Sequence, residues 1–329
     1  MAMNASVASL FGGAVLLVCP RDHEPLVRSG DRLTCMRGHC YDVADGIPIL
    51  LTDAQETHWG FQCRDPVERE SDLAHDREIR AGDHAIDPDV NKAVVWSSGN
   101  LYRSMLNKLK RYPIPDIRLP AGDGQLLLDI GCSWGRWSIA AARKGYRVVG
   151  VDPSFASVLC ARRVARQLGI DAAFIVSDAR HLPFANHSID TLFSYSVLQH
   201  LTPHDVGTAL SDFSRVLRPG GTSLIQMANC FGMLSLYHQA RRGFRAARYF
   251  EVSFYMPRQM RKEMEQRIGP THVSVDGYFG LGIQPADIDL MPMFERTIIF
   301  ASEALRRISK KFPPLKMVAD SLYFESRAE

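Results

Sequence analysis

The sequence is poor in the features that mark several large classes of protein. Its 329 residues carry 39 Lys and Arg against 36 Asp and Glu, and a net charge of +3 gives no general affinity for nucleic acid. No apolar run reaches the ~20 residues that span a bilayer. The seven cysteines are odd in number and scattered, so they do not make a disulfide framework. These absences predict a globular protein of a reducing cytoplasm, without a membrane partner.

The most informative pattern lies between residues 126 and 153. An apolar run at 126–128 predicts a short buried strand, and two glycines four positions apart, Gly131 and Gly135, follow it. A helix should follow, because apolar residues and alanines continue as far as Gly145. A second predicted strand, 146–151, ends at Asp152. This order of elements is typical of a nucleotide-binding βαβ unit, in which the final acid accepts hydrogen bonds from ribose hydroxyls.

The glycine spacing indicates which nucleotide the unit would bind. A dinucleotide site needs G-x-G-x-x-G, whereas this turn reads Asp129-x-Gly131-x-x-x-Gly135. A carboxylate in front of the turn would repel pyrophosphate but suits a ligand that carries an ammonium group. The segment resembles the class I S-adenosylmethionine-dependent methyltransferases with a type 11-like core. The resemblance implies S-adenosylmethionine as the cofactor.

Further segments match that family in register from about residue 124 to 229. The third and fourth predicted strands are 173–176 and 188–195, and a Leu-Arg-Pro-Gly-Gly turn at 217–221 leads into a fifth at 222–228. Segments 272–279 and 315–324 would then be the sixth and seventh strands. The resemblance implies an α/β fold, a Rossmann-like seven-stranded sheet that is mostly parallel with an antiparallel last strand.

The resemblance also implies a set of cofactor contacts around the carboxyl ends of these strands. Asp152 would bind the ribose, while Asp178 and Ala179 would read the adenine. His200, just after the fourth strand, is the candidate catalytic base, and its alternative role is to hold that loop in place. The full predicted cofactor set is Asp129, Gly131, Cys132, Ser133, Gly135, Asp152, Pro153, Ser154, Asp178, Ala179, Ser194 and Ser196.

The first 52 residues carry two clusters of metal-ligand residue types. Cys19, His23, Cys35 and His39 could bind Zn²⁺ from two tight turns, with Asp22 and Cys40 as alternates. The segment resembles Trm112-like zinc ribbons, although the second cysteine of that pattern is replaced by Asp22. A ribbon that has lost its metal is the open alternative.

The remaining segments divide the chain into three predicted parts. Residues 1–52 form the zinc-ribbon-like unit, the polar residues 53–91 form a linker with a helix near 68–80, and residues 92–329 form the methyltransferase domain. A helix is predicted from residue 92 to 110. Insertions near 231–250, which is rich in arginine, and near 281–313 should form a helical cap over the substrate.

Three functions remain open on the sequence. The first is methyl transfer to a small-molecule acceptor at oxygen, carbon or nitrogen, because the sequence lacks the Asn-Pro-Pro-Tyr type of tetrapeptide. The second is an RNA base methyltransferase that holds RNA with its ribbon and its arginine-rich helix. The third is a non-catalytic regulatory partner of another enzyme. The sequence leaves the acceptor and the oligomeric state undetermined.

Overall fold

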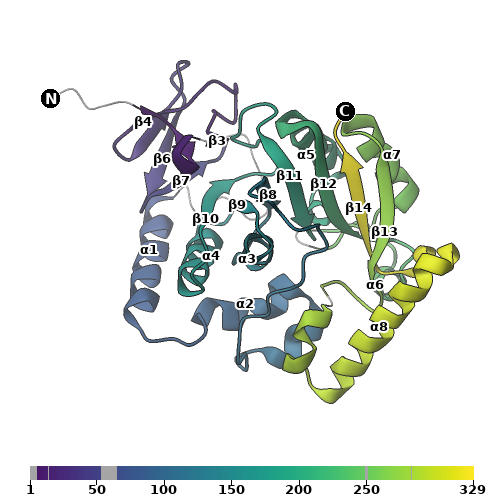
Figure 1. Cartoon of the computed structure of the whole chain (residues 1–329). Helices are drawn as coiled ribbons and strands as arrows, with labels where there is room; N and C mark the ends of the chain where they lie inside the picture. Colours follow the sequence, from purple (N-terminus) through teal and green to yellow (C-terminus); the bar gives the residue numbers. More distant parts are fainter. Residues whose placement is uncertain (1–5, 14, 53–64, 249–250, 283) are drawn as a thin grey trace.

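The computed structural model describes residues 6–13, 15–52, 65–248, 251–282 and 284–329. Figure 1 shows one large twisted sheet with helices packed on it. The strands are β1 Ser6–Val7, β2 Ser9–Leu10, β3 Val15–Leu16, β4 Val27–Ser29, β5 Arg32–Thr34, β6 Cys40–Ala44, β7 Ile47–Leu50, β8 Leu126–Ile130, β9 Arg147–Asp152, β10 Ala172–Ser177, β11 Ile189–Tyr195, β12 Leu217–Ala228, β13 Thr271–Gly277 and β14 Ser321–Arg327. The α-helices are α1 Pro66–Ala81, α2 Pro88–Ser98, α3 Arg136–Arg143, α4 Phe155–Gln167, α5 Pro203–Val216, α6 Met233–Arg241, α7 Pro257–Arg267 and α8 Met293–Lys311. Short 3-10 helices are η1 Phe11–Gly13, η3 Asn100–Met105, η4 Leu198–His200, η5 Pro285–Leu290 and η6 Pro313–Val318.

The central part of the sheet has the order β10-β9-β8-β11-β12-β14-β13. The first five of these strands are parallel to one another, and β14 is antiparallel to both of its neighbours. The mixed, mostly parallel sheet and the antiparallel final strand agree with the sequence-based prediction. The central strand β8 is buried along its whole length, which explains its continuous apolar run.

The sheet does not stop at the seven predicted strands. β7, the last strand of the N-terminal segment, pairs in parallel with β10, so in the described residues the sheet has 12 strands and runs on through β7, β6, β5, β4 and β1. The N-terminal strands lie at the purple end of the sheet in Figure 1, directly beside the core strands. The N-terminal segment therefore shares its sheet with the central strands, while the predicted domain divisions at 52 and 91 stay predictions.

Helices cover both faces of the sheet. Buried side chains of α3 and α8 pack with Leu127, Val148 and Phe193 on one face. Buried side chains of α5 and α7 pack on the other face, against Leu128 and Ile225. Because neighbouring residues of a strand point to opposite faces, these alternate strand positions give each helical layer its own part of the core.

Several predicted elements end at other residues in the structure. The single helix predicted at 92–110 is two elements, α2 and η3, because Gly99 between them has a φ of 102°. The seventh strand starts later than predicted, since Pro313–Val318 forms a 3-10 turn. The helix predicted at 231–250 ends at Arg241, and residues 249 and 250 lie outside the described part of the chain. Residues 53–64 of the predicted linker lie outside it too.

A buried ion pair ties the segment after β13 to the start of α3. Arg136 Nη2 and the Tyr102 hydroxyl both donate to Asp287 Oδ2, at 2.6 and 2.5 Å. Arg136 Nε also donates to the Pro113 carbonyl at 2.7 Å. All three side chains of this cluster are almost fully buried, so Tyr102 has a structural position. Among the described helices, none is both long and apolar enough to cross a bilayer.

Replacement of Asp287 by alanine should destabilise the protein strongly. The change leaves the Arg136 guanidinium buried without its carboxylate, for which a loss of about 3–5 kcal/mol in the free energy of unfolding is expected. Asp289→Ala is the matched control, since the Asp289 side chain is 64% exposed where it meets Arg111 and should cost less than about 1 kcal/mol. Denaturant melts of both variants make the comparison, and equal small losses would contradict the structural role of the buried pair.

Candidate functional site

Asp152, at the end of β9, holds the turn after β8 in place. Its Oδ2 accepts the backbone N–H of Ser133 and its Oδ1 accepts that of Ser154, both at 2.9 Å. Burial raises the pKa of Asp152 to about 6, although these two hydrogen bonds partly oppose the rise. Each carboxylate oxygen keeps a further acceptor position after these contacts, so the group can still receive donors from a ligand.

The two glycines of the turn have a left-handed backbone, with φ of +71° at Gly131 and +84° at Gly135. A Cβ at Gly131 would collide with the Val197 side chain. A Cβ at Gly135 would come within 3.2 Å of the Ala161 Cβ, which lies on α4. Both glycines are thus required for close packing of the turn as well as for its left-handed backbone.

The Asp129 side chain is buried and does not line the cavity described below. Its carboxylate accepts the hydroxyl proton of Ser138 at 2.6 Å, and the residue is only 1% exposed. Burial raises the pKa of Asp129 to about 7 against the opposing effect of this hydrogen bond, and nearby Asp152 adds to the rise. The expectation that this carboxylate meets an ammonium group is not supported by its position.

A large cavity of about 1440 Å³ opens over the carboxyl ends of the parallel strands. It exceeds the ~300–1,000 Å³ of a typical small-molecule site, so it has room for two ligands side by side. Its lining includes His200 and eight of the predicted cofactor residues, which are Gly131, Ser133, Asp152, Pro153, Ser154, Asp178, Ala179 and Ser196. The structure therefore brings together residues that lie up to 69 positions apart in the sequence (His200 minus Gly131).

Four predicted cofactor residues do not line this cavity. Asp129 and Gly135 pack against the inner side of the turn, as described above. Cys132 is 2% exposed and sits in the core with α4, and Ser194 is fully buried within β11. Sequence spacing alone does not distinguish these inner positions from the outer ones, because successive residues of a strand or turn face opposite sides.

Asp178 is already engaged by its neighbour Arg180. Asp178 Oδ1 accepts the backbone N–H and Nε of Arg180, at 2.8 and 3.0 Å, and its Oδ2 accepts Nη2 at 2.6 Å. Arg180 also reaches Asp205 at 3.1 Å. The Asp178 carboxylate already accepts three hydrogen bonds from Arg180, and an adenine amino group would donate a fourth. Arg180 therefore fixes the direction of the acceptor position that remains.

The sequence analysis missed one wall of the cavity. Ser97, Ser98 and Gly99 line it from the end of α2, together with Phe279–Gly282 after β13. Gly99 and Gly282 let the two backbones touch, since a Cβ on either would collide with a carbonyl of the other segment. Both glycines are visible in the sequence, and neither belongs to a predicted turn. Their contact depends on tertiary structure, so the sequence does not predict it.

His200 reaches the cavity from η4, the loop that follows β11. Its neighbour Gln199 holds this loop, because Nε2 donates to Ser196 Oγ at 2.6 Å and Oε1 accepts the Ala228 N–H at 3.1 Å. Tyr195 lines the cavity too, but its hydroxyl donates to the buried Asp276 at 2.6 Å. Gln199 thus stabilises the loop through these two hydrogen bonds. The role of His200, as a base or as a residue that stabilises the same loop, stays a prediction.

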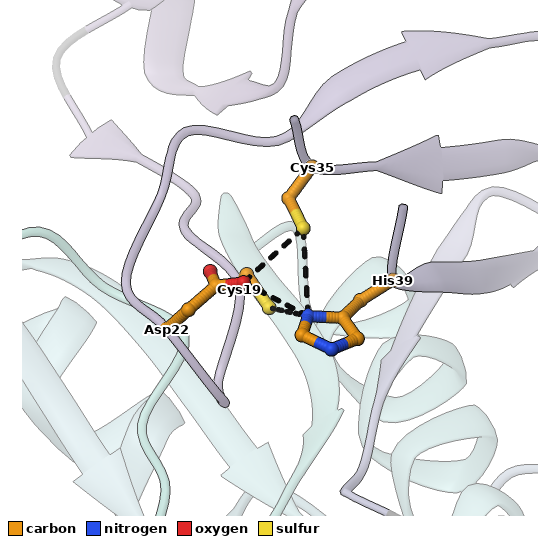
Figure 2. Close-up of side chains that lie close together, drawn as sticks. All are labelled: Cys19, Asp22, Cys35 and His39. Atoms are coloured by element: carbon orange, nitrogen blue, oxygen red, sulfur yellow. Dashed lines mark hydrogen bonds and ion pairs between the residues drawn. The ribbon is translucent and has the colours of Figure 1, made fainter. Parts of the chain in front are cut away.

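The N-terminal segment assembles a cluster of four possible metal ligands, which Figure 2 shows converging from separate turns. The ligand atoms of Cys19, Asp22, Cys35 and His39 all lie within 4.8 Å of one another. His39 Nδ1 is 2.8 Å from Asp22 Oδ2, 3.4 Å from Cys19 Sγ and 3.5 Å from Cys35 Sγ. Zn–S bonds of ~2.3 Å and Zn–N bonds of ~2.0 Å place tetrahedral ligands at about these separations.

The predicted metal ligand His23 is not part of this cluster. It has a φ of 60°, its N–H donates to the Cys19 carbonyl, and the adjacent Asp22 points to the other three ligands in its place. The alternate Cys40 is exposed and contacts Thr34. The left-handed backbone at His23 turns its side chain away, which the sequence does not reveal. The structure thus favours the alternate Asp22 over His23.

Comparison with known proteins bears on the central segment. Residues 127–221 match the family model described as a methyltransferase domain. Over this segment the chain is similar to methyltransferase domains. The match begins within β8 and ends in β12, so it includes the turn, Asp152, Asp178 and His200.

Curated relatives align over the same part of the chain. Methyltransferase GfsG of Streptomyces halstedii is 35% identical over 107 residues, which are 32% of this chain and 38% of that protein. The ubiquinone biosynthesis O-methyltransferase of Brucella anthropi is 33% identical over 32% of this chain and 42% of its own length. The malonyl-[acyl-carrier protein] O-methyltransferase of Yersinia pestis is 37% identical over 31% and 36%. The chain spans about two fifths of the length of these relatives.

Among solved structures, phosphoethanolamine N-methyltransferase 2 of Haemonchus contortus, in complex with S-adenosyl-L-methionine, has a TM-score of 0.47. It is 17% identical, and the superposition covers 85% of this chain and 61% of that one.

Proposed function

We propose that the protein transfers a methyl group from S-adenosylmethionine to a small-molecule acceptor at an oxygen, carbon or nitrogen atom. The observation that carries the proposal is the large cavity over the methyltransferase domain. Asp152, Asp178 and Ala179 line it at the ends of β9 and β10, while α6 and the residue 279–282 loop line it after β12 and β13, at the other end of the central strand order. This division leaves separate space for a nucleoside and for an acceptor.

The residues present fit the cofactor. Asp152 reaches the cavity at the end of β9, and its carboxylate has acceptor positions left for two ribose hydroxyls. The backbone of the glycine turn lines the cavity beside Asp152. Asp178 and Ala179 line it too, and they would bind the adenine. When bound, S-adenosylmethionine would supply a methyl group that is already activated by its sulfonium.

The chain's own task is then to position the acceptor and to exclude water. His200 lines the cavity from η4 and would take the proton from an acceptor hydroxyl or amine. Acceptors that lose their proton before the reaction would not need this base. Tyr195 is less suited to the task, because burial raises its pKa well above the usual range.

The arginine-rich segment contributes to the same cavity. Arg241, Arg242 and Arg245 line it, and Arg241 and Arg245 are also exposed, so the small-molecule acceptor is proposed from the cavity and not from these arginines. A second basic cluster on α8 is partly neutralised, since Arg306 and Arg307 both pair with Glu303. The regulatory alternative and the cytoplasmic location stay as predictions from the sequence.

The affinity for S-adenosylmethionine should depend on the ionisation of Asp152. Because ribose hydroxyls bind the charged carboxylate and its pKa is about 6, affinity should be full above pH 7 and fall below pH 6. The fall should approach about tenfold per pH unit. Asp152→Asn should lose about 2–4 kcal/mol of binding at pH 7.5 and show a flat pH profile. Calorimetric titration with S-adenosylmethionine measures both effects.

Asp129→Asn is the matched control, since Asp129 also has a raised pKa, of about 7, but does not line the cavity. Its profile should still fall near pH 6. If Asp152→Asn binds as tightly as the wild type, or if the wild type does not bind S-adenosylmethionine, the proposed function is wrong.

We also propose that the N-terminal cluster binds one Zn²⁺ through Cys19, Asp22, Cys35 and His39. Their mutual distances support a tetrahedral set, and two thiolates with a carboxylate and an imidazole are donors that zinc accepts. The metal would hold two turns together in a segment with little core of its own.

Protein purified without chelator should contain one zinc per chain by elemental analysis. Cys35→Ser and Asp22→Ala should lose it, because each removes one of the four donors. His23→Ala should retain it, since His23 faces away from the cluster. Metal-free wild-type protein, or zinc that depends on His23 but not on Asp22, would refute this ligand set.

A further inference from the structure

The cavity wall formed by α6 and the residues after it carries an excess of positive charge. From this wall, Leu234, Ser235, His238, Arg241, Arg242, Arg245, Glu251, Val252 and Phe254 line the cavity. Three arginines face one glutamate, which gives a net charge of +2 before His238 is counted. The excess lies on the side of the cavity that is formed by the arginine-rich segment, away from the Asp152 turn.

Several other charged side chains around the cavity already have protein partners. Arg245 makes two contacts with Glu251, at 2.6 and 2.7 Å, and Arg180 pairs with Asp178 and Asp205. Asp320 accepts two backbone N–H groups, those of Ser235 and Phe279. In the described parts of the chain, neither Arg241 nor Arg242 has a carboxylate within ion-pair distance.

Arg242 is held in a fixed position with a donor to spare. Its Nη1 donates to the Val252 carbonyl at 2.8 Å, and its guanidinium lies over the Phe254 ring, 5.1 Å from the centroid. Its Nε is buried and has no hydrogen-bond partner among the described residues. The guanidinium is thus oriented by protein contacts, while part of its hydrogen-bonding capacity is unused among the described residues.

The surroundings of Arg242 indicate the rest of the ligand. Val252 and Phe254 contact Arg242, and Leu234, Phe279 and Leu281 bring further apolar side chains to the cavity. A planar guanidinium that lines the cavity suits a carboxylate or phosphate, which it can bind in a forked geometry. We propose that the acceptor is an anion with an apolar body, whose carboxylate or phosphate binds Arg242 with the help of Arg241. This inference rests on the proposed function, because it assigns the far part of the same cavity to the acceptor.

The test uses three probes of similar size: phenyl phosphate, phenylacetate and the uncharged phenylacetamide. Their binding to the full chain is measured by ligand-observed NMR in the presence of saturating S-adenosylhomocysteine. At least one anion should bind, and the amide should bind about tenfold more weakly or not at all, as the loss of a charge-assisted hydrogen bond predicts. The stronger anion tells whether a phosphate or a carboxylate is the natural group.

Arg242→Gln should weaken the anion by about tenfold or more, and Arg242→Lys should restore part of the affinity. Arg248→Gln is the matched control, because Arg248 is exposed on the same segment and does not line the cavity. It should change the affinity by less than about twofold. The affinity for S-adenosylhomocysteine should be the same in all four proteins, which shows that each is folded.

The outcomes separate this inference from the proposed function. Failure of the wild type to bind S-adenosylhomocysteine would overturn both. Two results would overturn only the assignment of the acceptor while the cofactor binds normally. One is an anion affinity that does not change in Arg242→Gln, and the other is binding of the amide as tight as that of the anions. Loss of binding to a single-stranded RNA oligonucleotide in Arg242→Gln, with no effect on the small anions, would overturn it in favour of RNA.

Discussion

The site depends on one carboxylate that holds two backbone segments at once. Asp152 accepts an N–H from the turn after β8 and another from the start of α4, so the loops at two strand ends become a single surface. The turn can come this close because Gly131 and Gly135 adopt a left-handed backbone. Burial of the same carboxylate raises its pKa, and a ligand that supplies hydroxyl donors would favour its charged form.

The walls of the cavity come from segments that the core sheet does not itself provide. The buried pair of Arg136 and Asp287 fixes η5 against α3, and the loop at 279–282 packs against the end of α2 through two glycines. The arginine-rich segment, which comprises α6 and the residues after it, lines the same cavity. The cavity can in this way be shaped by segments other than the strands, while the turn at Asp152 stays the same.

The sequence predicted the elements whose signal is local. The apolar run at β8, the glycine turn and Asp152 follow from periodicity and spacing, and Asp178 and His200 reach the cavity as expected. The orientation of Asp129 towards Ser138 was not predictable, because one position along a strand reverses the direction of a side chain. Neither the pairing of β7 with β10 nor the exchange of His23 for Asp22 has a local signal, since the first depends on distant strands and the second on one backbone angle.

The central claim is that this cavity transfers a methyl group to a small molecule. The most direct measurement is transfer of label from methyl-labelled S-adenosylmethionine, with the small-molecule extract and the purified RNA of the source cells as separate arms. The account predicts label in a small molecule, and none when the chain carries Asp152→Asn. Label confined to RNA, or no transfer in either arm by protein that binds the cofactor, would contradict it.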